Sequence, residues 1–163
     1  MNVYLTNLGK YNEGELIGKW LELPLDESEI QRAMDEIGIN EDYEEYFLTD
    51  WECSPVDIWE YDNIYKLNEM AQELEELDQL EQETLEFLMK YMGFEWDAAI
   101  KKVKESDYTV YGNIGDETDL GHEIAQDWEI PEHLQYYIDY ASIGHDCLCS
   151  GWVLYGNNAY YVY

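Results

Sequence analysis

One stretch of the chain, from Lys66 to Lys90, has no basic residue between its two lysines and yet has the pattern of an amphipathic helix. Its apolar residues recur at steps of three and four: Leu67, Met70, Ala71, Leu74 and Leu77. The opposite side carries Glu69, Glu73 and Glu76 at the same steps. Like charges at this spacing destabilise a helix by roughly 0.2–0.5 kcal/mol per pair. We therefore interpret this acidic face as a feature that function requires and helix stability does not.

The whole chain shares this excess of acid. Its 163 residues include 38 Asp and Glu against 8 Lys and Arg, a formal net charge of -30. With 46% hydrophobic and 15% aromatic residues the chain is expected to fold, because disordered segments are poor in both. The charge argues against a nucleic-acid-binding protein, since phosphate binding needs Lys and Arg. The expected partners are cationic: a basic protein, metal ions, or a surface built to hold DNA.

The sequence also predicts the compartment. No apolar run reaches the length of about 18 residues that a transmembrane helix needs, and the start, MNVYLTNLGK, lacks the pattern of a signal peptide. We therefore expect no membrane contact. The three cysteines, Cys53, Cys147 and Cys149, are odd in number and poorly spaced for a disulfide framework. A reducing, cytoplasmic setting is the simplest interpretation.

Neither an enzyme nor a metalloprotein is predicted. The chain lacks the glycine-rich phosphate-binding motifs and the G-x-S-x-G motif of hydrolases. Among 38 acids no single pair of catalytic carboxylates stands out. His145, Cys147 and Cys149 include zinc-ligating residue types, but the second pair of ligands is missing, so buried thiols are favoured. The acidic runs lack the glycine and the closing glutamate of a calcium loop, and no cofactor is expected.

Residues 1–61 are expected to form an N-terminal α+β domain of three strands and one helix. The strands are predicted at 2–8, 20–23 and 46–51, with a glycine-containing loop between the first two. Asp26 and Glu29 form a capping box at the start of the helix, and Gly38 ends it. The core-facing stripe of this helix consists of Ile30, Ala33, Met34 and Ile37.

Residues 62–104 are expected to form a central helical domain. Asp62 is the predicted cap of its first helix, and Asp78 with Glu81 begins the second. The second helix should turn Glu83 and Glu86 outward and four residues inward: Leu80, Phe87, Leu88 and Tyr91. Gly93 suits a left-handed C-cap. The apolar residues of a third helix are Trp96, Ala99, Ile100 and Val103, and its lysines (Lys101, Lys102 and Lys104) are interpreted as compensating neighbouring acids.

Residues 105–163 are expected to form a C-terminal α+β domain. A strand is predicted at 108–112, and short helices at 117–128 and 131–141, with Pro131 at a first helical position. The tail reads as a hairpin of two aromatic strands around Gly156-Asn157-Asn158. The predicted fold class is therefore α+β, with three small domains in series and an elongated shape.

The charge invites comparison with duplex DNA, which carries one negative charge per about 1.7 Å of its axis. At this density a net charge of -30 would cover ~50 Å, or about fifteen base pairs. Carboxylates on folded elements could thus offer a DNA-binding groove the charge pattern that it expects. Acidic histone chaperones, halophilic proteins and calcium buffers have a similar charge balance. An acidic chaperone or binding module for basic proteins therefore remains the alternative.

Three stretches carry a resemblance to one family: VYLTNLGKYNEGELIGKWLELP at 3–24, LNEMAQELEELD at 67–78 and IPEHLQYYIDYASIGHD at 130–146. Over nearly its whole length the chain resembles the ArdA-type antirestriction proteins, with a local departure at Cys147 and Cys149. The resemblance implies a protein of mobile DNA that acts as a mimic of duplex DNA. It would block the DNA-binding groove of type I restriction-modification enzymes by stoichiometric competition. It also implies three small domains and a homodimer formed through the C-terminal domain.

The functional acids of this family are distributed, so no single residue carries over as essential. Our candidates for a DNA-mimicking surface are Glu41, Asp42, Glu44, Glu45, Glu69, Glu73, Glu76, Glu83, Glu86, Asp116, Glu117 and Asp119. By position, the strand that holds Tyr108, Val110 and Tyr111 is the candidate for the dimer contact. The expected partner is the restriction-modification enzyme, with neither nucleic acid nor membrane bound.

Overall fold

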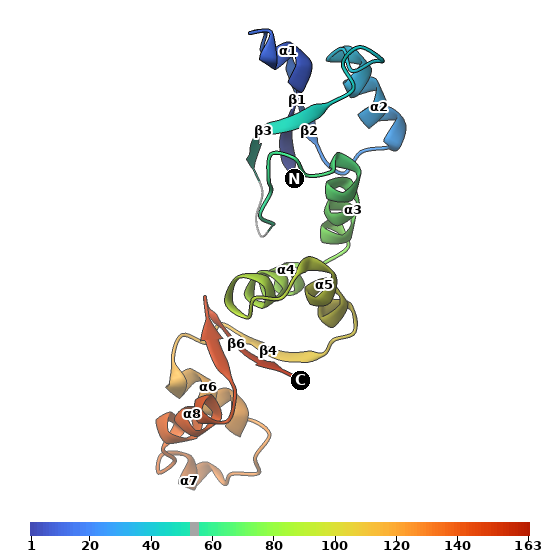
Figure 1. Cartoon of the computed structure of the whole chain (residues 1–163). Coiled ribbons are helices and arrows are strands. Elements are labelled where there is room, and N and C mark those ends of the chain that lie inside the picture. Colours follow the sequence, from blue (N-terminus) through green and yellow to red (C-terminus); the bar gives the residue numbers. More distant parts are fainter. Residues whose placement is uncertain (53–55) are drawn as a thin grey trace. The chain divides into compact units, whose positions relative to one another are not determined.

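A computed structural model of the protein describes residues 1–52 and 56–163, so Cys53 lies outside the described residues (Figure 1). The described chain forms two small antiparallel sheets and a series of mostly short helices, which confirms the predicted α+β class. It separates into two compact units, Met1–Gln82 and Glu83–Tyr163, called here the N-terminal and the C-terminal unit. This boundary divides the helices between residues 62 and 104, and the division into three domains remains a prediction.

The N-terminal unit is built on the sheet β2-β1-β3. Its strands are β1 (Asn2–Asn7), β2 (Gly18–Glu22) and β3 (Tyr46–Glu52), and both neighbours run antiparallel to the central β1. Val3 and Leu5 lie two residues apart and are both fully buried, as expected for one face of a half-buried strand. The three predicted strands are confirmed, and the first ends one residue earlier than expected.

A short helix, α1 (Leu8–Asn12), replaces part of the loop that the sequence predicted after the first strand. Buried Asn7 caps it, because its Oδ1 accepts a hydrogen bond from the backbone N–H of Lys10 at 2.9 Å. The amide nitrogen of Asn7 donates to the carbonyl oxygen of Ile37 at 3.1 Å, which ties the helix start to the end of α2. A helix of five residues is too short to show an apolar period, and for this reason the pattern missed it.

The predicted helix after Pro24 is confirmed as α2 (Glu27–Glu36). A carboxylate oxygen of Glu29 accepts a hydrogen bond from the backbone N–H of Asp26 at 3.3 Å, as the capping box requires. The predicted stripe of Ile30, Ala33, Met34 and Ile37 is buried. Gly38 follows with a φ of +80°, a left-handed conformation that terminates helices.

Helix α3 (Ile64–Glu75) begins one residue later than predicted. Its cap is Asn63, whose Oδ1 accepts from the N–H of Tyr65 at 2.9 Å. The predicted cap, Asp62, instead accepts from the N–H of Trp59 at 2.8 Å and closes the preceding turn. On the apolar side Leu67, Met70, Ala71 and Leu77 are buried and Leu74 is half-buried.

The capping box of α4 (Gln79–Glu86) is confirmed in both directions. Asp78 donates its N–H to Glu81 at 2.8 Å, and the Asp78 side chain accepts from the N–H of Glu81 at 2.9 Å. A π-helical turn, η1 (Phe87–Tyr91), follows and inserts one residue into the helical period. The prediction that Tyr91 faces inward is therefore wrong: it is 55% exposed. The prediction that Leu80 faces inward is also wrong, since it is 36% exposed in the first turn, whereas the inward positions of Phe87 and Leu88 are confirmed.

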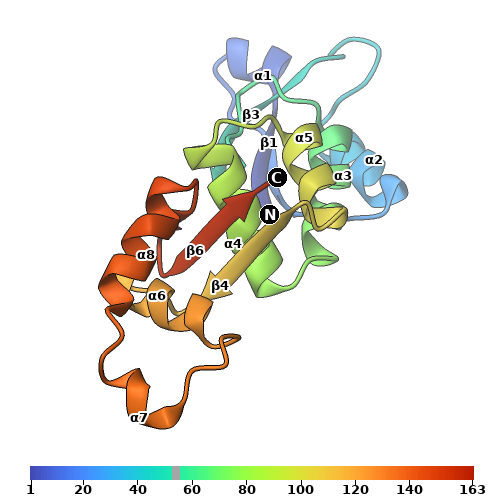
Figure 2. The same cartoon turned by 90° about the horizontal axis from the view of Figure 1, so that it is seen from below.

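The C-terminal unit is built on the sheet β4-β6-β5. Its strands are β4 (Tyr108–Gly112), β5 (Val153–Tyr155) and β6 (Asn158–Val162), which confirms the predicted strand and the terminal hairpin. Figure 2 shows β4 and β6 as neighbouring strands, with α8 beside β6 and α6 next to α8. The ring of Tyr160 in β6 stacks on Phe87 of η1, with centroids 4.2 Å apart. Helix α5 (Trp96–Lys104) also belongs to this unit, and its predicted apolar stripe is buried.

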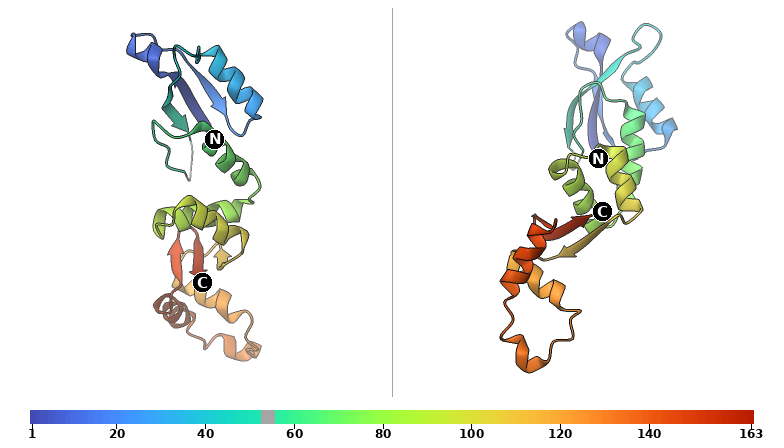
Figure 3. Two further views of the ribbon diagram at one scale, coloured as in Figure 1. Left: turned by 45° about the vertical axis from the view of Figure 1, so that its right-hand side comes forward. Right: turned by 60° about the horizontal axis from the view of Figure 1, so that its bottom comes forward.

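The remaining helices are α6 (Glu117–Ala125), α7 (Glu132–Gln135) and α8 (Tyr140–Cys149). The single helix predicted at 131–141 is wrong: α7 ends at Gln135, and a new helix begins at Tyr140 after Asp139, whose side chain accepts from the N–H of Ser142. Pro131 is the N-cap of α7 and not its first helical residue. Figure 3 shows α6 and α8 side by side and α7 apart from them. A β-carbon on Gly144 would lie 1.7 Å from the carbonyl oxygen of Glu117, so the two helices require glycine at their contact.

Candidate functional site

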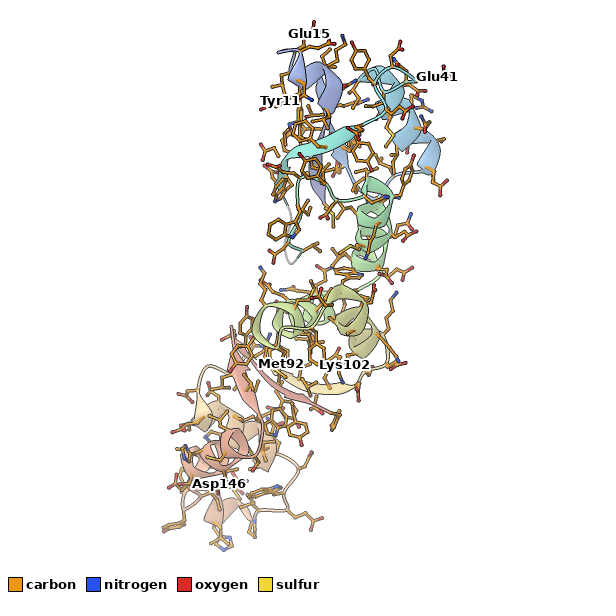
Figure 4. The ribbon with its side chains drawn as sticks, in the orientation of Figure 1. Tyr11, Glu15, Glu41, Met92, Lys102 and Asp146 are labelled. Carbon is orange, nitrogen blue, oxygen red and sulfur yellow. The ribbon has the colours of Figure 1, made fainter. Side chains whose placement is uncertain are left out.

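The loop between α2 and β3 carries four of the predicted acids: Glu41, Asp42, Glu44 and Glu45. All four are exposed, and none forms an ion pair with the described residues. Asn40 holds the loop, because its Oδ1 accepts from the N–H groups of Asp42 at 2.8 Å and Tyr43 at 3.2 Å. Figure 4 shows Glu41 pointing away from the sheet. The four carboxylates, here called the loop acids, therefore face solvent on an ordered turn.

Next to the loop acids lies a small network centred on Tyr43. Its hydroxyl donates to Glu13 at 2.8 Å, and the ammonium of Lys10 pairs with Glu13 at 2.9 Å and lies 4.5 Å from the centre of the Tyr43 ring. The hydrogen bond to Glu13 raises the pKa of Lys10, and the same bond lowers the pKa of Glu13. Lys10 therefore compensates Glu13 and leaves the loop acids uncompensated.

The acids of α3 have mixed surroundings. Glu69 is exposed and forms no ion pair within the described chain, and it borders a hollow of about 250 Å³ together with Asp26 and Glu27. Glu76 is exposed, but Glu73 is half-buried, and both make interactions of their own. The glutamates thus lie at the predicted steps, but they differ in exposure.

Glu83 and Glu86, predicted to face outward, are half-buried and bonded within the C-terminal unit. Glu83 accepts a hydrogen bond from the side-chain amide of Asn158 at 2.8 Å. Glu86 pairs with Lys90, one turn later, at 2.9 Å. No sequence signal pointed to the first partner, because Asn158 lies 75 residues further along the chain, whereas Lys90 is four residues from Glu86 and was a local signal that the prediction missed.

The acids predicted in the third region cluster at the N-terminus of α6. Asp116 caps the helix by accepting from the N–H groups of Thr118 at 2.8 Å and Asp119 at 3.0 Å. Asp119 accepts from the N–H of Gly115 at 3.0 Å, and Glu117 lies 3.2 Å from the imidazole of His145. These three carboxylates stabilise the fold of the C-terminal unit locally.

The lysines of α5 lie close to acids of the same unit. Lys101 lies 3.9 Å from Glu105, and Lys102 pairs with Asp107 and donates to the carbonyl oxygen of Tyr163 at 2.8 Å. Figure 4 shows Lys102 beside the second sheet. This agrees with the interpretation that the cluster compensates neighbouring acids.

The thiols of α8 differ from the prediction of buried cysteines. Cys147 is half-buried, and its burial raises the pKa of the thiol, whereas Cys149 is exposed because it lies two residues further round the helix. The Sγ of Cys149 lies 3.7 Å from Nε2 of His145. In the described part of the chain no group of three His, Cys, Asp or Glu side chains is arranged to hold a metal ion.

The strand proposed for the dimer contact, β4, lies at the edge of its sheet. Among the described strands it pairs with β6 alone. Tyr111 stacks on Trp152 with centroids 5.1 Å apart and packs on the core residues Ile114, Leu120 and Ala159. Tyr108 and Val110 point to the opposite face by strand alternation. The side chain of Tyr111 is thus already used within its own unit.

The sequence reasoning did not single out an aromatic hollow after β3. It measures about 1010 Å³ and is lined by Trp51 and residues 56–62. The available signal was the run WEYD at 59–62, in which aromatic and acidic residues alternate.

Fold and surface together define a small acidic α+β protein with an excess of solvent-facing carboxylates. The profile of the family described as antirestriction protein (ArdA) matches residues 3–162, and the chain therefore belongs to this family. The resemblance drawn from the three sequence stretches is confirmed. A comparison with curated proteins gave no match. Membership implies an antirestriction protein, an inhibitor class and not an enzyme class, with restriction-modification enzymes of type I as the implied partner.

None of the helices within 1–52 and 56–163 combines the length and the apolar character needed to cross a membrane.

Proposed function

We propose that this protein inhibits type I restriction-modification enzymes by occupying their DNA-binding groove, with its carboxylates in the place of DNA phosphates. The observation that carries the proposal is the set of loop acids: four exposed carboxylates on an ordered turn, none with a cationic partner in the described chain. A groove lined with Lys and Arg supplies the missing partners. The mechanism is stoichiometric competition and involves no turnover.

Two physical properties make such carboxylates competent substitutes for phosphates. Ordinary Asp and Glu side chains are ionised at neutral pH, so the charge is permanent under the conditions of competition. An ordered backbone has already lost the entropy that a flexible acidic tail would lose on binding. Association should therefore be fast and should weaken as the salt concentration rises.

The contribution of each acid follows from its surroundings. The loop acids and Glu69 have no internal partner to give up, so we assign them the main contact. Glu83, Glu86, Asp116, Glu117 and Asp119 remain candidates that would contribute charge while keeping their internal bonds. Because many contacts share the binding, one Glu-to-Gln change should reduce inhibition only slightly. Complete loss from a single change would contradict the distributed mechanism.

A homodimer through β4 extends the proposal to a longer DNA substitute. The edge of β4 opposite β6, with which no described strand pairs, offers backbone groups to a second copy, which would join two three-stranded sheets into one. The contact would then be made by the strand edge, since the ring of Tyr111 packs inside its own unit. Val110→Pro removes one backbone N–H of β4. If this N–H points away from β6 and joins the second copy, sedimentation at low concentration should show more monomer.

Displacement of DNA tests the function directly. Labelled duplex bound to a type I methyltransferase core is titrated with this protein, and fluorescence anisotropy is followed at two salt concentrations. We expect release near one dimer per enzyme and weaker competition at the higher salt concentration. If a competent enzyme keeps its DNA while the protein binds histone-like proteins broadly, the acidic-chaperone alternative replaces the proposal.

A further inference from the structure

The aromatic hollow after β3 has a lining that suits a cationic side chain. It measures about 1010 Å³ and belongs entirely to the N-terminal unit. Its residues are Trp51, Val56, Asp57, Ile58, Trp59, Glu60, Tyr61 and Asp62. Trp59 is 74% exposed and Tyr61 is 73% exposed. Two large rings this exposed indicate a contact surface, because their burial is normally a major source of stability.

The segment that carries these rings is anchored. Val56 and Ile58 are each 5% exposed, so alternate residues are buried while Asp57 and Trp59 point outward. The backbone N–H of Leu48 in β3 donates to the carbonyl oxygen of Glu60 at 2.7 Å. The turn is closed by Asp62, which accepts from the N–H of Trp59 at 2.8 Å. The rings are therefore held out from the core by a fixed backbone.

The acids of the hollow set the charge of its occupant. Asp57 and Glu60 are exposed and Asp62 is half-buried, and within the described chain none of them forms an ion pair. The hollow combines aromatic faces with uncompensated carboxylates. Such a combination attracts a cation by the ring quadrupole and by direct charge pairing.

Among protein cations the arginine side chain fits this combination best. Its planar guanidinium is weakly hydrated, stacks on aromatic faces and can hydrogen-bond a carboxylate with two N–H groups at once. The ammonium of lysine is a strongly hydrated point charge and gains less from a ring. Aromatic faces next to carboxylates therefore select arginine over lysine, which a surface of carboxylates alone does not do.

We propose that this hollow binds an arginine side chain of the partner, with the guanidinium stacked on Trp59 or Tyr61 and paired with Asp57 or Glu60. The proposal rests on the proposed function for the identity of the partner, since a DNA-binding groove presents arginines. It adds a contact that the backbone of duplex DNA does not make, because phosphates offer no aromatic face and the faces of the bases are stacked inside the helix. With this contact the protein would bind its partner by aromatic stacking in addition to the charge pairing that it shares with DNA.

Direct binding tests the selectivity. The full-length protein is ¹⁵N-labelled and titrated with a blocked decapeptide of alternating arginine and alanine, and with its lysine counterpart of equal charge. The arginine peptide should bind roughly threefold to fivefold more tightly and shift the indole N–H signal of Trp59. Trp59→Ala should remove this difference, and the matched control Trp128→Ala, at an exposed tryptophan of the C-terminal unit, should preserve it. Equal affinity for the two peptides in the wild-type protein would overturn the proposal.

A second variant separates the aromatic contribution from the charge. Asp57→Asn with Glu60→Gln leaves the rings in place and should weaken both peptides, the arginine peptide by more. Because both side chains are exposed, the fold should be unaffected, and the amide spectrum of the other residues verifies this. If the preference for arginine is unchanged in this variant, Asp57 and Glu60 do not contribute to arginine binding.

The displacement titration distinguishes a failure of this inference from a failure of the proposed function. If the wild-type protein releases DNA from the enzyme but shows no preference for arginine, the inference fails and the proposed function stands. If the arginine preference holds and depends on Trp59 while DNA is not released, the hollow remains an arginine site and the proposed function fails. If both hold, Trp59→Ala should weaken competition by roughly threefold to tenfold.

Discussion

The two compact units use their acids in different ways. Met1–Gln82 carries 23 acidic residues against four basic ones, and Glu83–Tyr163 carries 15 against four. In the first unit the loop acids face solvent without a partner in the described chain. In the second unit the predicted acids cap α6, pair with Lys90 and His145, or bond to Asn158. Among the predicted acids, those of the loop thus act as free charges, whereas those of the second unit act as structural groups.

This difference teaches that net charge overstates the surface available to a partner. A carboxylate that already accepts backbone N–H groups has part of its field compensated, and a partner gains less from pairing with it. We therefore expect inhibition to depend more on the N-terminal acids and stability more on the C-terminal ones. The following changes test this comparison.

The largest effect is expected from Gly144→Ala in α8. The added β-carbon would lie 1.7 Å from the carbonyl oxygen of Glu117, so α6 and α8 must separate, and the C-terminal unit should lose about 3 kcal/mol or more of unfolding free energy. Urea denaturation followed by amide NMR measures each unit separately. Gly115→Ala is the control, since its nearest contact is the flexible Asp119 side chain at 3.3 Å. Equal stability of the two variants would contradict the tight helix contact.

Neutralising the loop acids together should give the largest loss of inhibition. The variant combines Glu41→Gln, Asp42→Asn, Glu44→Gln and Glu45→Gln, and its affinity for the enzyme should fall by roughly tenfold or more. Thermal stability should be unchanged or higher, because these charges have no internal partner to lose. The control neutralises four acids of the other unit, Asp97, Asp127, Glu129 and Glu132, with the same change in net charge. If the control variant loses more affinity for the enzyme than the loop variant does, inhibition depends more on the C-terminal acids, contrary to our expectation.

Removing the cap of α6 should affect stability and leave inhibition nearly intact. Asp116→Ala loses the acceptor for two backbone N–H groups, which should lower the stability of the C-terminal unit by about 1 kcal/mol. Asp116→Asn keeps a capping oxygen and should stay close to the wild type. Both variants are compared by denaturation and by DNA displacement. A loss of inhibition in both, without a loss of stability, would assign Asp116 to the partner contact.

The smallest effect concerns the pH dependence of α8. Hydrogen bonds from the backbone and side chain of Ser142 lower the pKa of Asp139 below its ordinary value of 3.8. The ionised form therefore stabilises the folded state above pH 3.8, and this contribution is lost as the pH falls through the lowered pKa. Asp139→Asn should flatten the decline of stability in that acidic range and change little at pH 7. Identical acid profiles for wild type and variant would contradict the assignment.

Local signals of the sequence predicted much of this structure. The capping boxes at Asp26 and Asp78, the left-handed Gly93 and the hairpin at Gly156 each depend on residues a few positions apart, and all are confirmed. The exposure of the loop acids agrees with prediction for the same reason, since a short acidic turn between two elements has little apolar surface to bury. Their role in binding remains a prediction.

Much of what failed in the prediction depended on features that no local pattern records. The outward turn of Tyr91 follows from a π-helical insertion, and the packing of α8 on α6 depends on the glycine contact between them. The cap at Asp139, which begins α8, was a local signal that the prediction missed. The partner of Glu83 lies 75 residues away.

The sequence by itself determined the charge, the class of fold and the family, because composition, periodicity and motif order are properties of the chain. Only the tertiary structure decided which carboxylates are free, since a charge is compensated by whatever the fold brings near it. The same holds for the aromatic hollow, where Val56 and Ile58 take buried positions while Trp59 and Tyr61 remain exposed.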